Sequence, residues 1–400
     1  MSWLDGLLAT LNTLQRGLLG LLHALGLAPL VHGQPAWPFD GRISAAMLSI
    51  DAGHARQVVL VLALLALAGL ALLLALLLRW AWRRPRAAGT ATGLALASAA
   101  AAAWAWPAPA LLWAPATPTS WHQLPAGQEA GAALQGRRLY QQHCLACHGE
   151  RGDGDGPQAR AAAATGERWP PTLNRALLWQ RSDGELFWHL RHGIRDPDGR
   201  PRMPALPADV PDAAVWQLVT WLQWHAAGQQ LARGGEWQLP VAAPDVQVQC
   251  DQAVPRPLSA LRGQRLRLVA LAPGQPPLPE DPRFQTVTLR AYSMNGASNA
   301  RADDGCHAES AAAWQAYALV AGVAPEALAG TEFLIDRDGW LRARRRAGDP
   351  PWSEAMLVCR SPTAAAAPAA MSAPGADPLD RLLARLDAEP LRPVRGGRLH

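Results

Sequence analysis

Long apolar runs dominate the first quarter of the chain. Residues 58–78 contain no charge, and residues 90–113 form a second apolar run that ends in tryptophans. About twenty consecutive apolar residues are needed for an α-helix to cross a bilayer. Arginines at 79, 83, 84 and 86 separate the two runs. Because short arginine-rich loops stay on the cytoplasmic side, we predict a transmembrane hairpin over residues 58–113 with the rest of the chain outside the cytoplasm.

The segment before this hairpin, residues 1–57, has a weaker pattern. Its leucine-rich part, residues 17–31, is short for a membrane span and contains three glycines that weaken a helix. The pattern fits a first membrane helix and an amphipathic helix on the membrane surface equally well. A loop outside the cytoplasm follows, in which His32 and His54 are candidate copper or haem ligands, although ordinary loop histidines are the simpler interpretation.

Between residues 133 and 232, helical periodicity alternates with loops rich in glycine and proline. A polar helix precedes Cys144, and the last helix lies around residues 214–222. Residues 149–157 have glycine or proline at nearly every second or third position, so they form a loop. This pattern predicts helices separated by loops, joined to the hairpin by a linker over residues 114–132.

The polar helix runs directly into Cys144-Leu145-Ala146-Cys147-His148. Two cysteines separated by two residues and followed by histidine have the spacing that attaches haem c, through two thioethers and an iron–histidine bond. A zinc site needs a second ligand pair, which Cys250, Cys306 and Cys359 do not supply. A redox dithiol usually opens a helix after an apolar strand, unlike this pair. We therefore predict one covalently bound haem c.

The domain resembles the class I c-type cytochromes. Gly136 and Tyr140 stand where the first helix of that family carries a glycine and an aromatic residue before the haem cysteines. Leu218 and Trp221 match the apolar and aromatic residues of the last helix, which packs across the first. The resemblance covers about a quarter of the chain, and it implies electron transfer as the function.

The same resemblance implies the ligands of the haem iron. It gives His148 as the proximal ligand and Met203, in a proline-rich loop, as the distal ligand. In such domains a proline carbonyl after the haem motif orients the proximal imidazole, and Pro157 is the best-placed candidate. The alternatives that remain open are Pro170 or Pro171 for this proline and His189, His192 or His225 for the distal ligand.

After residue 245, alternating residues predict strands over residues 265–271, 286–290, 331–336 and 340–344, and a helix over 309–323, which indicates an α/β domain over residues 245–360. Residues 333–342 resemble the late hairpin of redoxin and thioredoxin-like proteins. The domain has no Cys-x-x-Cys, and Gly330 stands where such folds usually carry a cis-proline, so the resemblance implies a degenerate, non-catalytic copy. An Ala/Pro-rich linker and tail over residues 361–400 contains one short amphipathic helix.

Three cysteines remain after the haem pair, and in an oxidising compartment two of them are expected to pair. Cys250 and Cys359 bracket the C-terminal domain, and a bridge between them would close a long loop. The alternative pairs Cys306 with either of them. We predict the Cys250–Cys359 bridge and a free Cys306.

Composition excludes one class of partner. Half of the residues are apolar and 17% are charged, and arginine supplies the whole basic complement behind the formal net charge of +5. A chain without lysine reflects coding bias more than chemistry, and no basic patch with interleaved aromatic residues is present. We predict no nucleic-acid partner.

The sequence thus predicts a multi-domain protein with N-terminal transmembrane helices, an all-α cytochrome c domain and a C-terminal α/β thioredoxin-like domain. It is expected to carry single electrons at the bacterial inner membrane, with the haem and C-terminal domains facing the periplasm. Its expected partners are a redox protein or the subunits of a respiratory complex. Two other functions stay open: a haem-coupled thiol oxidoreductase or peroxidase that uses the C-terminal domain, and a copper-handling membrane protein.

Overall fold

The structure is a computed structural model of the 400-residue chain. It describes all residues except 1–2, 44–51, 107–112, 125–128, 165, 167–168, 175–177, 179–180, 197, 238–239, 252, 273, 277–278, 292–304, 360–376, 390 and 392–400. The chain forms two compact units. The first contains Met1–Pro29 and Trp37–Pro118, and the second contains Leu30–Ala36 and Thr119–Pro393.

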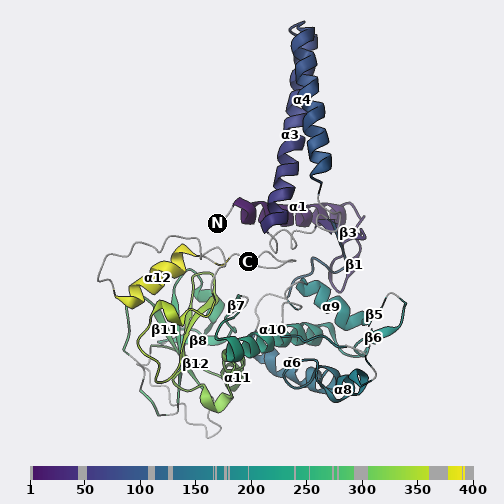
Figure 1. Ribbon diagram of the computed structural model, residues 1–400. Helices are drawn as coiled ribbons and strands as arrows, with labels where there is room; N and C mark the ends of the chain where they lie inside the picture. Colours follow the sequence, from purple (N-terminus) through teal and green to yellow (C-terminus); the bar gives the residue numbers. More distant parts are fainter. Residues whose placement is uncertain are drawn as a thin grey trace. The chain divides into compact units, whose positions relative to one another are not determined.

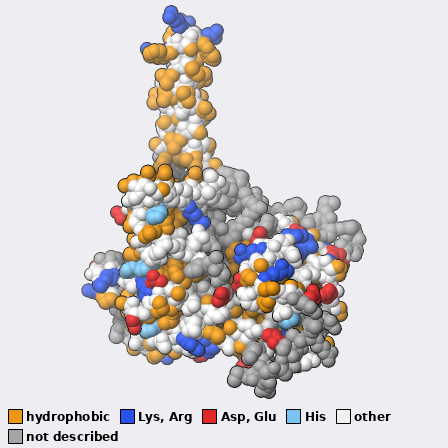
Figure 2. Space-filling view, turned by 180° about the vertical axis from the view of Figure 1, so that it is seen from behind, with side chains coloured by type: hydrophobic (Ala, Val, Ile, Leu, Met, Phe, Trp, Pro, Cys, Tyr) orange, Lys and Arg blue, Asp and Glu red, His pale blue; other side chains and the backbone are white. Residues whose placement is uncertain are grey.

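The first unit is built around two antiparallel helices, α3 (Ala52–Trp80) and α4 (Pro85–Trp104), which we call the apolar hairpin (Figure 1). Both helices are long and apolar enough to cross a membrane, over Val59–Trp80 and Pro85–Trp104. Hydrophobic side chains cover the outside of the hairpin, and arginines gather at its tip (Figure 2). The unit also contains helix α1 (Trp3–Ala24) and a two-stranded sheet of β3 (Gly41–Ile43) and β4 (Trp113–Pro115).

The predicted extent of the hairpin, residues 58–113, is wrong at its end. Helix α4 stops at Trp104, and Trp113 lies in β4, opposite Ile43 of β3. The sequence explains this early end, because Pro107 and Pro109 follow closely and the residue before a proline is disfavoured in a helix.

The second unit begins with a helical domain that surrounds the predicted haem motif. Helix α6 precedes the motif, helix α7 is a single turn inside it, and the long helix α10 crosses α6. A short hairpin of β5 and β6 lies within the predicted loop between α9 and α10. The bounds are α6 (Ala130–His143), α7 (Leu145–His148), α8 (Pro157–Ala163), α9 (Asp183–His192), α10 (Asp212–Gly234), β5 (Ile194–Arg195) and β6 (Pro201–Met203).

Part of the predicted linker, residues 114–132, packs against the helical domain. Thr119 is buried and its hydroxyl donates to the carbonyl oxygen of Gly184 in α9, at 2.6 Å. His122 is buried too, and its Nε2 lies 3.1 Å from the carbonyl oxygen of Pro35, in the hairpin of β1 (Leu30–Val31) and β2 (Gln34–Pro35). The interpretation of this stretch as a plain tether is therefore wrong for Thr119 to His122.

A sheet-rich domain follows. In the described part of the chain its eight strands are ordered β7-β14-β13-β10-β11-β12-β8-β9, with β10, β11 and β12 mutually parallel and the other pairs antiparallel. The strands are β7 (Val241–Ala242), β8 (Gln247–Cys250), β9 (Arg256–Pro257), β10 (Leu266–Leu271), β11 (Gln285–Arg290), β12 (Cys306–Glu309), β13 (Glu332–Ile335) and β14 (Trp340–Arg345). Short 3-10 helices cover Leu258–Leu261, Pro325–Ala327 and Glu354–Met356.

Two helices cover the sheet, one on each face. Successive side chains of a strand point to opposite faces, and along β13 Phe333 joins a core with helix α11 (Ala311–Ala321) while Leu334 joins a core with helix α12 (Pro378–Ala388). Helix α12 confirms the predicted amphipathic helix in the tail. Its Asp377 and Asp380 pair with Arg283 at 2.7 and 2.8 Å.

The structure contradicts the predicted disulfide. Cys250 pairs with Cys306, 56 residues along the chain, and Cys359 is a free, buried thiol. The reason is strand register: β8 and β12 lie side by side, with Cys250 directly opposite Cys306. Neither strand was predicted from the sequence.

The helical and sheet-rich domains share one hydrophobic core, with α11 packed against α6 and α10. A side chain at Gly228 of α10 would place its Cβ only 1.9 Å from the carbonyl oxygen of Leu319, so only glycine allows these helices to meet. The indole of Trp237 donates to the carbonyl oxygen of Val320 at 3.0 Å. Helix α10 therefore belongs to both domains.

Candidate haem site

The two cysteines of the motif lie at the junction of α6 and α7. The backbone N–H of Cys144 donates to Tyr140 in the last turn of α6, and that of His148 donates back to Cys144, at 2.8 Å each. Both thiols are free, and the thiol of Cys147 lies 3.1 Å from Oε1 of Gln158. Burial, with Cys147 nearby, raises the pKa of Cys144 to about 12. One helical turn thus carries two thiols and an imidazole.

His148 has a buried ring nitrogen that is left without a hydrogen-bond partner. Its Nδ1 atom is buried and has no hydrogen-bond partner among the residues that the structure describes. Burial lowers its pKa to about 4, so the imidazole is neutral at pH 7, the form that binds metals. A buried polar atom without a partner costs about 1–3 kcal/mol, and such atoms often mark functional sites. Two free thiols beside this imidazole fit a covalently attached haem.

The glycine-rich loop after the motif folds back over it. The backbone N–H of Gly154 donates to His148 at 2.9 Å, and that of Gly156 donates to Cys147 at 3.0 Å. The carbonyl oxygen of Pro170 lies against Gly154, 2.5 Å from where a Cβ would stand. Pro157, in contrast, begins α8 and is exposed. None of the described prolines accepts a hydrogen bond from His148 Nδ1, so the orienting proline stays a prediction.

The hairpin of β5 and β6 holds Met203. Met203 is half-buried and lies directly opposite Ile194. Gly193, at the end of α9, lies against the Met203 carbonyl, and the N–H of Leu206 donates to Leu190 in α9 at 2.9 Å. The loop that carries Met203 is thus fastened to α9 at both ends. Its role as distal ligand stays a prediction.

The crossing of α6 and α10 confirms the residues on which the family resemblance rests. A Cβ at Gly136 would lie 2.4 Å from the carbonyl oxygen of Gln217, so glycine sets the closeness of the two helices. The Tyr140 and Trp221 rings lie 4.5 Å apart, and the Tyr140 hydroxyl donates to the carbonyl oxygen of Gly149 at 2.6 Å. This bond ties the helix crossing to the residue that follows His148.

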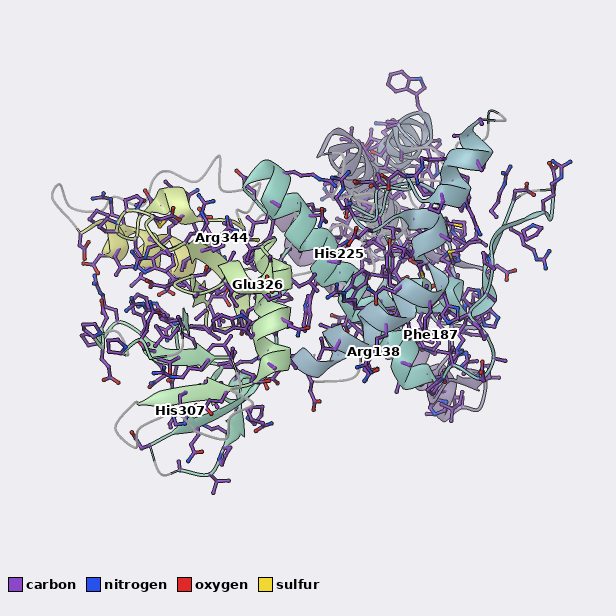
Figure 3. All side chains as sticks on the ribbon, turned by 90° about the horizontal axis from the view of Figure 1, so that it is seen from below. Arg138, Phe187, His225, His307, Glu326 and Arg344 are labelled. Carbon is purple, nitrogen blue, oxygen red and sulfur yellow. A yellow bond between two sulfur atoms is a disulfide. The ribbon has the colours of Figure 1, made fainter. Side chains whose placement is uncertain are left out.

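The alternative histidine ligands have other partners. Nε2 of His189 accepts from Arg181 at 2.8 Å. The ring of His192 packs on Trp188, with centroids 3.8 Å apart. His225, on α10 (Figure 3), stacks on Trp221 at 4.5 Å.

His225 and the N-terminal histidine His32 differ in their hydrogen-bond partners. Nε2 of His225 is buried without a partner among the described residues, as is Nδ1 of His148. His32 pairs with Asp212, Nδ1 to Oδ2, at 3.0 Å. The side chain of His54 lies outside the described residues. Across the described chain, no three His, Cys, Asp or Glu side chains gather as a metal site.

Residues 131–222 match the family model described as "Cytochrome C oxidase, cbb3-type, subunit III". The helical domain is a c-type cytochrome domain. A domain of this kind implies a haem cofactor and transfer of electrons through it. The match begins within α6 and ends within α10, close to the predicted residues 133–232. No curated protein matches the chain.

Sequence reasoning missed two contributors to this domain. Gln158, which faces the Cys147 thiol, lies in α8, directly after the glycine-rich loop in the sequence, and no motif marks it. Thr119 lies in a proline-rich stretch that reads as a linker. The one signal that was available is Gly184, whose missing side chain makes room for the Thr119 carbonyl.

Proposed function

We propose that this protein is a membrane-anchored electron carrier whose single haem is attached covalently through Cys144 and Cys147. The observation that carries the proposal is the buried, unsatisfied Nδ1 of His148 beside two free thiols. The match of residues 131–222 to a subunit of a respiratory oxidase supports it. When bound, the haem supplies a one-electron iron couple.

The chain's own residues would hold and tune that haem. His148 is the proximal ligand, and its Nδ1–H is available to a carbonyl oxygen, for which Pro157, Pro170 and Pro171 remain the candidates. Met203 is the distal ligand. Because its loop is fastened to α9, the thioether is positioned before the haem is bound. With His148 and Met203 both bound to the iron, the domain would act as an electron carrier rather than an enzyme.

The anchor is the apolar hairpin. Its tip carries Arg79, Arg83, Arg84 and Arg86, which favour the cytoplasmic side, so the cytochrome domain faces the periplasm of a bacterial inner membrane. Attachment of haem to such a motif on that side supports the same orientation.

The sheet-rich domain is proposed to be a degenerate thioredoxin-like domain. Three parallel strands, β10 to β12, are followed by α11 and then by β13, which runs antiparallel beside β10, and this order supports the resemblance. Between β10 and β11 the described residues form no helix, and the stretch contains no cysteine. The described residues thus supply no redox helix of the kind that such folds carry, and we propose that the domain serves as a docking surface for a redox protein or respiratory-complex subunit.

The first test is haem staining on a denaturing gel. The Cys144→Ser, Cys147→Ser double variant should lose the stain, whereas Cys359→Ser, which changes a buried free thiol, should keep it. Stain retained by the double variant at normal protein level would refute covalent attachment through this pair.

The second test addresses Met203. The oxidised protein should show the weak sulfur-to-iron charge-transfer band and resist carbon monoxide and cyanide. Met203→Ala should lose the band and bind both ligands. An unchanged protein that already binds carbon monoxide would overturn the carrier function in favour of an enzyme.

A further inference from the structure

Helix α1 buries two amide side chains beside Leu19. Asn12 and Gln15 are buried, and Gln15 Oε1 accepts a hydrogen bond from the backbone N–H of Ile43 in β3 at 3.0 Å. On the other side, four leucines at helical spacing form a stripe that is between 42% and 63% exposed. We call it the α1 leucine stripe; it consists of Leu14, Leu18, Leu21 and Leu25.

Water does not favour this arrangement. Burying one leucine side chain gains about 1.5–3 kcal/mol, so a helix facing water would turn its leucines inward and its amides outward. Here both amides face the protein, and Gln15 accepts the hydrogen bond from strand β3. The exposed stripe therefore fits a non-aqueous medium.

The level of that medium is marked by aromatic residues. Strand β3, which Gln15 holds, pairs with β4 just after the end of α4, so α1 is tied to the end of the hairpin opposite the arginine tip. At this same end, Trp104, Trp106 and Trp113 are between 49% and 92% exposed. Exposed tryptophans gather where a bilayer meets water.

We propose that α1 lies flat in the outer boundary of the membrane, with its leucine stripe among the lipids and its amides on the β3–β4 layer. The inference rests on the proposed anchoring of the hairpin and adds the lipid surface as the partner of α1. Leu60 and Leu62 of α3 are also exposed, on the hairpin to which α1 is tied. An apolar face of this kind sinks about 5–10 Å into the boundary region.

The same contacts argue against a third membrane span. If α1 crossed the bilayer, Gln15 would carry strand β3, and β4 paired with it, into the hydrocarbon region. Open sheet edges exposed to lipid do not occur there, because their backbone groups lack partners.

The experiment measures the depth of single labels on the full chain in vesicles of dioleoyl phosphatidylcholine and phosphatidylglycerol. Leu18→Cys, Gly20→Cys and Leu72→Cys are labelled with an environment-sensitive fluorophore, and the unsubstituted protein, whose free Cys359 is buried, gives the background. Gly20 lies off the stripe and has nothing within 4 Å of its absent side chain, so it is the matched control. Lipids carry a nitroxide quencher near the headgroup or near the chain end, and each signal is normalised to quencher-free vesicles.

The Leu18 label should lose most fluorescence with the shallow quencher, the Gly20 label should lose less with both, and the Leu72 label should respond to the deep one. A Leu18 label quenched most by the deep lipid would mean a third span and refute the proposal. If neither quencher affects the Leu18 label while the Leu72 label responds, a protein covers the stripe. This result would also refute the proposal. If Leu72 fails to respond as well, the anchoring itself is wrong.

Discussion

Gly136 shows how one missing side chain sets the geometry around the haem motif. Its place against Gln217 brings α6 and α10 together, and the Tyr140 ring packs on Trp221 across this contact. Tyr140 then holds Gly149, the residue after His148. The position of the motif therefore depends on Gly136, a residue that lies outside the motif itself.

Gly136→Ala should destabilise the protein. The added Cβ would lie 2.4 Å from the Gln217 carbonyl oxygen, and overpacking of this kind costs about 1–3 kcal/mol. The midpoint of urea unfolding in detergent, followed by circular dichroism, measures the loss. The control is Gly131→Ala in the same helix, where nothing lies within 4 Å and a gain of about 0.5–1 kcal/mol is expected. Equal effects of the two substitutions would contradict the close helix crossing.

His225 should make stability depend on pH. Burial lowers its pKa from the usual 6.5 to about 4, so between these values the unfolded chain binds the proton and the folded protein does not. The free energy of unfolding therefore falls as the pH drops from 6.5 towards 4, by at most about 3 kcal/mol from this residue.

Unfolding midpoints measured across that range should fall less steeply for His225→Gln than for the parent. His143→Gln, which changes an exposed residue at the end of α6, should leave the slope as it is. A parent-like slope in His225→Gln would show that His225 takes up its proton in the folded protein.

For single residues, the sequence predicts the class of cofactor better than it predicts which cysteines form a disulfide. The spacing from Cys144 to His148 and the glycine at 136 were sufficient to predict a c-type cytochrome domain, because both can be read from a short stretch of chain. The Cys250–Cys306 bond was not predictable in the same way. Closing the longer loop to Cys359, about twice the length, differs by only about 0.6 kcal/mol, so loop entropy cannot choose between partners. Strand register chooses, and it is set by contacts far apart in the sequence.

Among the elements, β8 and β12 illustrate a disulfide that fixes one edge of a sheet. Val248 of β8 is fully buried, whereas Cys250 is partly exposed at the end of its strand and Cys306 is buried. Only two residue pairs join β8 to β12. The covalent bond strengthens a short contact between these strands.

Peptide mapping without reduction should recover Cys250 linked to Cys306. Cys359 should react with an alkylating reagent only after unfolding, because it is buried in the native protein. Mapping also separates the electron carrier from a thiol oxidoreductase. A bond that a dithiol substrate reduces in the folded protein, with turnover, would support the enzyme, whereas a bond that resists reduction until unfolding supports a structural role.

Other elements show where periodicity is insufficient. The strands β10, β11, β13 and β14 and the helix α11 are close to their predicted positions, because each has a clear alternating or helical pattern. Strands β7, β8, β9 and β12 have two to four residues each, which is too short for a pattern to be recognised. The end of α4 depended on prolines rather than on hydrophobicity.

For the whole molecule, orientation across the membrane is the property with the most consequences. A phosphatase reporter fused to the C-terminus should be active, because the hairpin returns the chain to the periplasmic side. The same reporter inserted after Arg84, in the arginine-rich tip, should be inactive. A stable but inactive C-terminal fusion would place the cytochrome domain in the cytoplasm.

The close contact of Gly228 with Leu319 has a kinetic consequence. Helix α10, about 35 Å long by its 23 residues, is packed into both domains, so they cannot swing relative to each other. A partner that binds the sheet-rich domain meets the haem motif at one fixed distance and angle. The entropy of orienting the two redox centres is then lost once, at binding. Electron transfer between the haem and the bound partner would then be unimolecular. Its rate would not depend on a motion of one domain relative to the other.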